Sequence, residues 1–337
     1  MNIRDIARLA RVTPGTVSKV LNNYPDISEA TRQHVLKIIE ENQYDPKANA
    51  RTSKTAPENT RIGLVVEGVY NSLHSEIEDT LSLNIHNAGY AISSFHDNYF
   101  AQDKQEKMGE LKSYVERNKL AGLIYIGGNF TALGSEEFAT LPCPTIFLNT
   151  VLPFQPDTPD YSSIQVDHYE TACAQMRYLV DRGHLNICTV ISSAIDNSVY
   201  GLRAQAYQDT LVQSGLSHNL SHFLESDYQC EKAYAVLSQH LRLHPEISAI
   251  CCETDSIIPG VIRAIHDAGR LPGEDVEIIS FDGLKSTQYC IPSISTFVQP
   301  VQEMVRYTFD LLLGLINKER EHQHIIFRPL FIRRESC

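Results

Sequence analysis

The sequence predicts a small all-α helix-turn-helix headpiece followed by a larger α/β part made of two subdomains. Apolar residues recur at helical spacing through residues 1–45, and a polar linker covers residues 46–60. From residue 61 onward, short apolar strands alternate with helices. This alternation is typical of parallel sheets with helices on both faces. The chain of 337 residues is long enough for two or three domains.

The headpiece is expected to begin with two short helices. Ile6, Leu9 and Ala10 recur at helical spacing and are expected to face a core. Thr13 is a typical N-cap and Pro14 suits a first helical turn, so a second helix should begin there. Its inward-facing residues are expected to be Val17, Val20 and Leu21. Its outward-facing residues are expected to be Thr16, Ser18, Lys19 and Asn22.

A third helix completes the expected headpiece. Ser28 should cap this helix, and Val35, Ile38 and Ile39 should close a small core. Two short helices joined by a tight turn, the second with a polar outer face, make a helix-turn-helix. In nucleic-acid binding proteins the second helix of this motif enters the major groove of DNA. The alternative is a small helical bundle that binds no nucleic acid.

The charge distribution limits where DNA could bind. The formal net charge is −12, but residues 1–60 hold nine Lys/Arg and seven Asp/Glu, which leaves −14 on the rest. An acidic surface repels phosphate, so DNA contacts should be confined to the N-terminal part. The sequence has no apolar run long enough to span a membrane and no apolar leader, and its eight cysteines have no C-x-x-C spacing. We therefore expect a soluble cytoplasmic protein with reduced thiols.

The part from residue 61 to residue 337 should contain two subdomains of about 100 residues each. We expect strands at residues 62–67, 91–95, 122–126, 145–148, 187–191, 223–224, 249–252, 276–281 and 325–332. We expect helices at residues 75–88, 103–118, 169–182, 200–214, 230–242 and 257–268. In such folds a ligand binds between the subdomains, at the carboxyl ends of the strands.

These motifs resemble the LacI family of bacterial transcriptional regulators. In the headpiece the resemblance rests on Asp5–Ala7, Val12, Thr16–Asn22, Ser28–Arg32 and Tyr44–Pro46. In the remainder it rests on Gly183, His184, Arg203, Asp255, Phe281, Asp282, Gln299 and Pro300. The resemblance implies a periplasmic-binding-protein-like core of two Rossmann-type subdomains, with chain crossovers near residues 161, 292 and 322. It also implies a homodimer, since no leucine heptad follows residue 332.

The resemblance also implies which residues contact DNA. The family reads bases with three positions of the second helix, which here are Pro14, Gly15 and Lys19, and only Lys19 has a side-chain donor. Phosphate contacts are expected from Thr13, Thr16, Ser18 and Asn22. The linker matches the family's hinge helix at Ala50 and Arg51, but Ser53 replaces the leucine that wedges between bases. Strong kinking of DNA is therefore not expected, although Arg51 and Lys54 should hold phosphates.

The resemblance places a small-molecule effector at Arg203 and Asp282. A guanidinium fork and a carboxylate together suit the vicinal hydroxyls of a sugar. The other expected lining residues are Leu73, His74, Asn197, Val199, Tyr228, Thr254 and Asp255. Purine-binding relatives carry aromatic residues at positions 73 and 74, so a sugar is favoured over a purine. The competing interpretations are a surface charge for Arg203 and a turn-forming Asp-Gly pair for Asp282.

The expected function is repression of transcription by a dimer at a pseudo-palindromic operator, under the control of a small molecule. One alternative is a purine-type regulator that needs a corepressor, and another is a sugar-binding protein without a DNA role. No catalytic set, cofactor or metal is expected. Gly127-Gly128 lacks the G-x-G-x-x-G pattern, and His322 with His324 lacks a third ligand and is expected in a solvated loop.

Overall fold

The structure is a computed structural model in which residues 7–10, 12–13, 16–17, 20, 27–41, 61–67, 72–97, 104–153, 160–192 and 199–337 are described. The headpiece belongs to one compact unit and nearly all of the core to a second. The two units are described separately. In the described part of the chain, no helix is both long enough and apolar enough to cross a membrane. All eight cysteines are free.

The headpiece packs around a small apolar core. Its buried residues are Ala7, Ala10, Val17, Val20 and Val35, with Val12, Ile27, Ile38 and Ile39 partly buried against them. The backbone N–H of Thr16 donates to Thr13 Oγ1 at 3.1 Å, and that of Thr31 donates to Ser28 Oγ at 3.3 Å. Both predicted caps are therefore confirmed, and Ser28 precedes α3 (Glu29–Glu41).

The expectation for Leu9 is wrong, because its side chain is 50% exposed and Ala7 takes the inward position. Ile6 and Leu21 lie outside the described residues.

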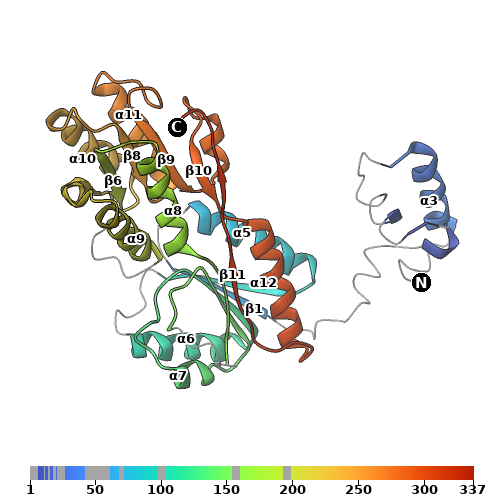
Figure 1. The fold of residues 1–337 in the computed structure, drawn as a ribbon. Helices are drawn as coiled ribbons and strands as arrows, with labels where there is room; N and C mark the ends of the chain where they lie inside the picture. Colours follow the sequence, from blue (N-terminus) through green and yellow to red (C-terminus); the bar gives the residue numbers. More distant parts are fainter. Residues whose placement is uncertain are drawn as a thin grey trace. The chain divides into compact units, whose positions relative to one another are not determined.

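The first subdomain is built on a six-stranded sheet in the order β11-β5-β4-β3-β1-β2 (Figure 1). Its strands are β1 (Arg61–Glu67), β2 (Ala91–Asp97), β3 (Leu120–Ile126), β4 (Thr145–Leu148), β5 (Ser162–Val166) and β11 (His324–Phe327). Its helices are α5 (Ser72–Asn87), α6 (Lys104–Asn118), α7 (Ser135–Ala139) and α12 (Val301–Ile316). Val65, Tyr125 and Phe147 pack in one apolar cluster with residues of α6 and α7.

The second subdomain repeats this arrangement, with the strand order β12-β10-β9-β8-β6-β7. Its strands are β6 (Ile187–Ile191), β7 (Phe223–Glu225), β8 (Ala249–Cys252), β9 (Glu277–Asp282), β10 (Ser295–Val298) and β12 (Leu330–Ile332), and β12 runs antiparallel to β10. Its helices are α8 (His168–Asp181), α9 (Val199–Gln213), α10 (Cys230–Leu243) and α11 (Ile258–Asp267). Three short 3-10 helices complete it: η1 (Ser217–His222), η2 (Asp255–Ile257) and η3 (Lys285–Tyr289).

Both faces of the second sheet are buried. Cys251 packs with residues of α8 and α9, whereas its neighbours Ile250 and Cys252 pack with residues of α10 and α11. A strand covered on both sides needs apolar residues at successive positions, and this explains the unbroken apolar run of β8 and the apolar run of β6, which only Thr189 interrupts. The predicted parallel sheets with helices on both faces are confirmed.

The chain crosses between the subdomains three times. It leaves the first sheet after β5, returns after β10, and crosses again between β11 and β12. We expected crossovers near residues 161, 292 and 322, and each lies a few residues further along the chain. Those positions came from the family resemblance and not from predicted strands. From the sequence, β5 and β10 were not predicted as strands, and the single strand expected at 325–332 is divided between the two sheets.

The histidines near the chain's end also differ from expectation. His324 begins β11 instead of lying in a loop. The Nδ1 atom of His322 lies 3.0 Å from Ser162 Oγ, and that of His324 lies 2.9 Å from Ser163 Oγ. These histidines therefore help to pair β11 with β5.

Two glycines should respond in opposite ways to replacement by alanine. A Cβ atom at Gly260 in α11 would lie 2.2 Å from the carbonyl oxygen of Cys230, whereas one at Gly109 in α6 would meet nothing within 4 Å. We expect Gly260→Ala to lower the free energy of unfolding by roughly 1–3 kcal/mol through overpacking. Gly109→Ala should raise it by about 0.5–1 kcal/mol, because alanine favours the helix. Urea denaturation measures both, and equal effects would contradict the packing of α11 against α10.

Candidate functional site

The predicted DNA-contact residues lie in the headpiece and linker, where the structure describes two of them. Thr13 Oγ1 and Thr16 Oγ1 are hydrogen-bonded at 2.9 Å, in addition to the backbone cap that Thr13 provides. The Thr13 side chain is exposed. The other predicted contacts lie outside the described residues: Pro14, Gly15, Ser18, Lys19, Asn22, Ala50, Arg51, Ser53 and Lys54.

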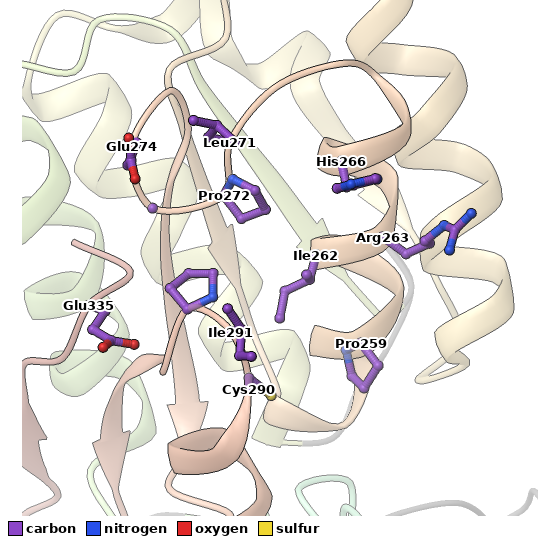
Figure 2. A pocket seen from close by; sticks show the side chains of 12 residues that line it. Pro259, Ile262, Arg263, His266, Leu271, Pro272, Glu274, Cys290, Ile291 and Glu335 are labelled. Atoms are coloured by element: carbon purple, nitrogen blue, oxygen red, sulfur yellow. The ribbon is translucent and has the colours of Figure 1, made fainter.

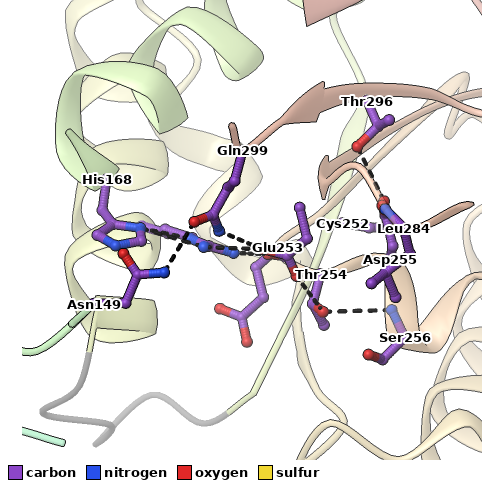
Figure 3. A network of polar contacts seen from close by, with 12 residues as sticks. Asn149, His168, Cys252, Glu253, Thr254, Asp255, Ser256, Leu284, Thr296 and Gln299 are labelled. Carbon is purple, nitrogen blue, oxygen red and sulfur yellow. Dashed lines mark hydrogen bonds and ion pairs between the residues drawn. The ribbon is translucent and has the colours of Figure 1, made fainter. Parts of the chain in front are cut away.

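Arg203 is the centre of a buried polar network in the core. Figure 3 shows labelled members of this network, among them His168, Asn149 and Gln299. It belongs to α9 and is only 1% exposed, so it is not a surface charge. Its Nη2 donates to Asp282 Oδ1 at 3.1 Å, and its Nε and Nη2 lie 3.3 and 3.2 Å from His168 Nδ1. Its Nη1 donates to the backbone carbonyl of Glu253. The guanidinium carbon lies 3.6 Å from the centre of the Phe281 ring, which fixes the plane of the fork.

Asp282 ends β9 and receives further hydrogen bonds. Thr254 Oγ1 donates to Oδ2 at 2.8 Å, and Gln299 Nε2 donates to Oδ1 at 2.9 Å. The backbone of Asp282 has a φ of 108°, and Gly283 follows with a φ of 80°. The extended strand conformation therefore ends here, although no turn is assigned at residues 282–284. The carboxylate of Asp282 pairs with Arg203.

A hydrogen bond joins this network to the first subdomain. Asn149 directly follows β4, and its Nδ2 donates to Gln299 Oε1 at 3.0 Å. Gln299 in turn directly follows β10 and donates to Asp282. The network therefore connects the carboxyl ends of strands from both sheets, which is where such folds bind ligands.

His168 and Asn149 each have a buried polar side-chain atom without a hydrogen-bond partner among the described residues, and both residues lie at one end of the network in Figure 3. These atoms are His168 Nε2 and Asn149 Oδ1. Because His168 Nδ1 accepts from Arg203, its Nε2 carries the proton. Burial and the nearby Arg203 charge hold the pKa of His168 well below its usual value, so the ring is neutral. A buried donor and a buried acceptor without partners each cost about 1–3 kcal/mol unless a ligand satisfies them.

An apolar and aromatic cluster adjoins the network. Val199, Tyr200 and Tyr228 pack against Val151 of the first subdomain, and the two tyrosine rings meet edge to face at 4.7 Å. The Tyr200 ring also lies 4.7 Å from the Arg203 guanidinium carbon. The predicted residues Val199 and Tyr228 are therefore brought close to Arg203, while Asn197 lies outside the described residues.

The predicted residues Leu73 and His74 are buried in the first turn of α5. Burial lowers the pKa of His74 to about 4, so its imidazole is neutral at pH 7. Leu73 also lines a hollow of about 460 Å³ together with Asp282 and Gln299. A larger hollow of about 880 Å³ lies at α11 and shares no lining residue with the polar network.

Asp255 is held by hydrogen bonds from two neighbouring segments. Its two oxygens accept hydrogen bonds from the backbone N–H of Leu284 at 2.7 Å and from Thr296 Oγ1 at 3.0 Å. It therefore anchors the loop that follows Asp282 to β10. Burial, together with the charge of Asp282, raises the pKa of Asp255 to about 7.

Four residues of the network and its aromatic flank were not singled out as site residues from the sequence. They are His168, Asn149, Gln299 and Tyr200. The signal that could have found the first three is their position, since each follows a strand at its carboxyl end. Two of those strands, β5 and β10, were not predicted. Tyr200 carried a weaker signal, as the aromatic residue one helical turn before Arg203.

The raised pKa of Asp255 predicts a pH dependence of stability. Since its folded pKa lies above its ordinary value of 3.8, the folded chain holds the proton more tightly than the unfolded chain. This contribution is complete below about pH 4 and is lost as the pH rises towards 7. Asp255→Asn mimics the protonated group, so melting curves from pH 5 to 8 should show the wild type losing stability relative to the variant. The buried histidines titrate in both proteins, so parallel curves would contradict the prediction.

Comparisons with known proteins agree with this architecture. Residues 2–47 match the lacI family of bacterial regulatory proteins, and residues 176–337 match a periplasmic binding protein-like domain. The chain is 32% identical over 339 residues to the HTH-type transcriptional regulator MalR of Clostridium butyricum, covering 100% of this chain and 99% of that protein. It is 28% identical over 333 residues to catabolite control protein A of Priestia megaterium, covering 98% and 96%.

More distant relatives and solved structures extend the likeness. The chain is 25% identical over 337 residues to the transcriptional repressor PurR of Vibrio cholerae, covering 99% of this chain and 97% of that protein. A complex of the regulator CelR with cellobiose covers 100% of both chains at 20% identity, with a TM-score of 0.66. A lac repressor dimer bound to operator covers 100% of this chain and 98% of that chain at 19% identity, with a TM-score of 0.65. The named relatives are regulators of transcription and not enzymes. The chain therefore belongs to the LacI family of DNA-binding transcriptional regulators.

Proposed function

We propose that the protein is a cytoplasmic, homodimeric repressor whose affinity for operator DNA is set by an uncharged sugar bound between the core subdomains. The headpiece of residues 1–45 binds the operator, residues 46–60 act as the hinge, and residues 61–337 bind the effector and form the dimer. The observation that carries the proposal is the buried network of Arg203, Asp282, His168 and Asn149, which joins the two subdomains.

The operator contact follows from the headpiece. Thr13 caps the second helix, whose polar face carries Lys19 as its main base-reading donor. A surplus of two positive charges over residues 1–60 gives one headpiece weak affinity for phosphate. Two headpieces of a dimer on a pseudo-palindromic operator compensate for this weakness, because the second one binds at a high effective concentration.

A sugar suits the hydrogen-bonding groups of the network. A sugar hydroxyl both donates and accepts, and the network offers the donor His168 Nε2 and the acceptor Asn149 Oδ1. Tyr200 and Tyr228 supply an aromatic surface for the apolar face of a sugar ring. Residues 73 and 74 are Leu and His, and therefore offer no aromatic pair for stacking a purine. Among solved structures of similar fold, one is a complex with cellobiose and another a complex with lactose.

The charges at the network favour a ligand without net charge. Arg203 is paired with Asp282, and Lys107 of α6 is paired with Glu67 at the end of β1. A phosphate group would have to compete with these carboxylates for their cations, at a desolvation cost. These pairings support a neutral sugar over a sugar phosphate.

The effector and the operator are coupled through the subdomain arrangement. The hydrogen bond between Asn149 and Gln299 joins the two subdomains, so a ligand that binds Asn149 competes with or extends this bond. Any difference in ligand affinity between two arrangements shifts their populations. The coupling is reciprocal, because operator DNA must then change sugar affinity by the same factor.

Replacing Tyr228 with alanine tests the effector site. Tyr228 is only partly buried, so its loss should cost little stability but should weaken sugar binding by about tenfold, through the lost ring contact. The wild-type full chain is first screened by thermal shift against maltose, cellobiose, lactose, sugar phosphates and purine bases. The sugar that raises the melting temperature is then titrated, with fluorescence anisotropy of operator DNA as a second measurement.

The matched control is Tyr234→Ala, which removes a partly buried tyrosine of α10 from the same subdomain. It should leave sugar binding unchanged. Equal losses in the two variants would contradict the placement of the effector. A purine hit, or operator affinity that saturating sugar does not change, would contradict the proposed function itself.

The hollow of about 880 Å³ supports the proposed dimer (Figure 2). Ile262, Pro272 and Ile291 surround it, and Ile291 is 89% exposed. Exposed apolar surface around a hollow is typical of a protein interface, and a second copy of this chain would bury it symmetrically. The relative solved with operator is itself a dimer, which supports this choice of occupant.

Introducing a charge at Ile291 should weaken the dimer. Ile291→Glu would bury a carboxylate in the interface, so analytical ultracentrifugation should show a monomer at concentrations where the wild type is a dimer. Operator affinity should fall with it, because the two headpieces are no longer held together. Leu185→Glu changes another exposed apolar residue outside this hollow and should leave the dimer intact. A dimeric Ile291→Glu variant would place the interface elsewhere.

A further inference from the structure

Three histidines of the second subdomain come together, although His222 is 18 residues away from His240 along the chain. His222 ends η1, His240 lies in the last turn of α10, and His244 caps the C-terminus of α10. One possible ligand nitrogen from each lies within 4.8 Å of the other two. His240 and His244 are four residues apart, so α10 presents them on the same face. No feature of the effector or DNA sites uses this cluster.

Two of the rings face each other through their nitrogens. His222 Nδ1 and His240 Nε2 are 2.8 Å apart, so one of them must carry a proton that the other accepts. A metal ion bound by both nitrogens replaces that proton. The rings are otherwise packed closely, with the His240 and His244 centroids 4.3 Å apart, so only modest side-chain rotation separates this arrangement from a coordinating one.

Glu246 orients the third ring. His244 Nδ1 lies 3.0 Å from Glu246 Oε1, which leaves Nε2 of His244 as its possible ligand atom. A carboxylate that accepts the second ring N–H of a histidine is the usual outer partner of a metal ligand, because it fixes the tautomer and makes the other nitrogen more basic.

We propose that His222, His240 and His244 bind one divalent transition-metal ion of the Zn²⁺ type, with Glu246 as the outer carboxylate. Three imidazole ligands suit Zn²⁺, Ni²⁺ or Cu²⁺, and not Mg²⁺ or Ca²⁺, which prefer oxygen. Zn–N bonds of about 2.0–2.1 Å in a tetrahedron place the nitrogens about 3.3 Å apart. His240 and His244 are only partly buried, so solvent can supply the fourth ligand.

A metal ion at this site would link the edge strand of the second sheet to the end of a helix. His222 directly precedes β7, the edge strand of the second sheet, while His240 and His244 belong to the C-terminal end of α10. A shared ion joins the two segments in the folded chain only, so binding stabilises the fold in proportion to the ion's affinity.

The first test uses the untagged full-length chain after treatment with a chelator. Isothermal titration with ZnCl₂ should give one ion per chain, and Zn²⁺ at ~100 times its dissociation constant should raise the melting temperature by about 5 °C or more. MgCl₂ should produce no shift. His240→Gln should lose the response to Zn²⁺. The matched control is His96→Gln, which removes an exposed histidine that also pairs with a carboxylate, Glu78 at 3.2 Å, and should keep the response.

A spectroscopic measurement on the wild type tests the site even if the His240→Gln variant fails to fold. Co²⁺ should give the visible absorption of a four-coordinate ion, and one equivalent of Zn²⁺ should abolish it. No Zn²⁺-induced shift in the wild type, a full shift in His240→Gln, or a lost shift in His96→Gln would each overturn the proposal. The outcome is independent of the effector, because neither the screen with sugars nor operator binding enters it.

Discussion

The buried ion pair between Arg203 and Asp282 is the interaction on which the core depends. A charge pair removed from water is costly unless its remaining donors and acceptors are matched. Here His168, the Glu253 carbonyl, Thr254 and Gln299 provide those matches, and Phe281 covers the guanidinium. Because these partners come from the carboxyl ends of separate elements, the pair holds the ligand-binding edge of the second sheet in one arrangement. Removing either charge leaves the other buried and unpaired, so such a change alters stability together with any ligand affinity.

The strands with continuous apolar sequences could be predicted from the sequence, and the polar strands could not. The bounds of β4, β6 and β8 agree with prediction because each is an apolar run buried on both faces. By contrast, β5 begins with Ser162 and Ser163, and β10 with Ser295 and Thr296. These residues are buried because hydrogen bonds satisfy them: Ser162 Oγ pairs with His322 Nδ1, and Ser295 Oγ accepts from the backbone N–H of Arg334. Such pairing joins residues that are far apart in the sequence, so the hydropathy of the sequence does not reveal it. The helix α12 was also not predicted, although its buried residues recur at helical spacing.

The same limit applies to the candidate site. The resemblance to a family was enough to single out Arg203 and Asp282, whose chemistry is conspicuous in the sequence. Asn149, His168 and Gln299 were missed as site residues because their importance lies in where strands end, and two of those strands were not predicted. Asp255 was also predicted as a ligand contact because it follows β8, and that stays a prediction. In the structure its oxygens accept hydrogen bonds from Leu284 and Thr296. A carboxylate after a strand can thus serve the fold as readily as the ligand, and only its hydrogen-bond partners distinguish the two.

The topology explains how a small change at the network can be transmitted along the chain. The crossovers follow β5, β10 and β11, and these strands lie at one edge of each sheet, since the orders begin β11-β5 and β12-β10. Connections gathered at one edge act as a hinge, about which the rest of each subdomain can rotate. The link between Asn149 and Gln299 adjoins this hinge, because Gln299 lies in the second crossover itself. A ligand that replaces Gln299 as the hydrogen-bond partner of Asn149 therefore acts where a small displacement becomes a rotation.

The linker enters the core at Arg61 of β1, in the first subdomain. A rotation of the first subdomain relative to the second is consequently carried directly into the chain that leads to the headpiece.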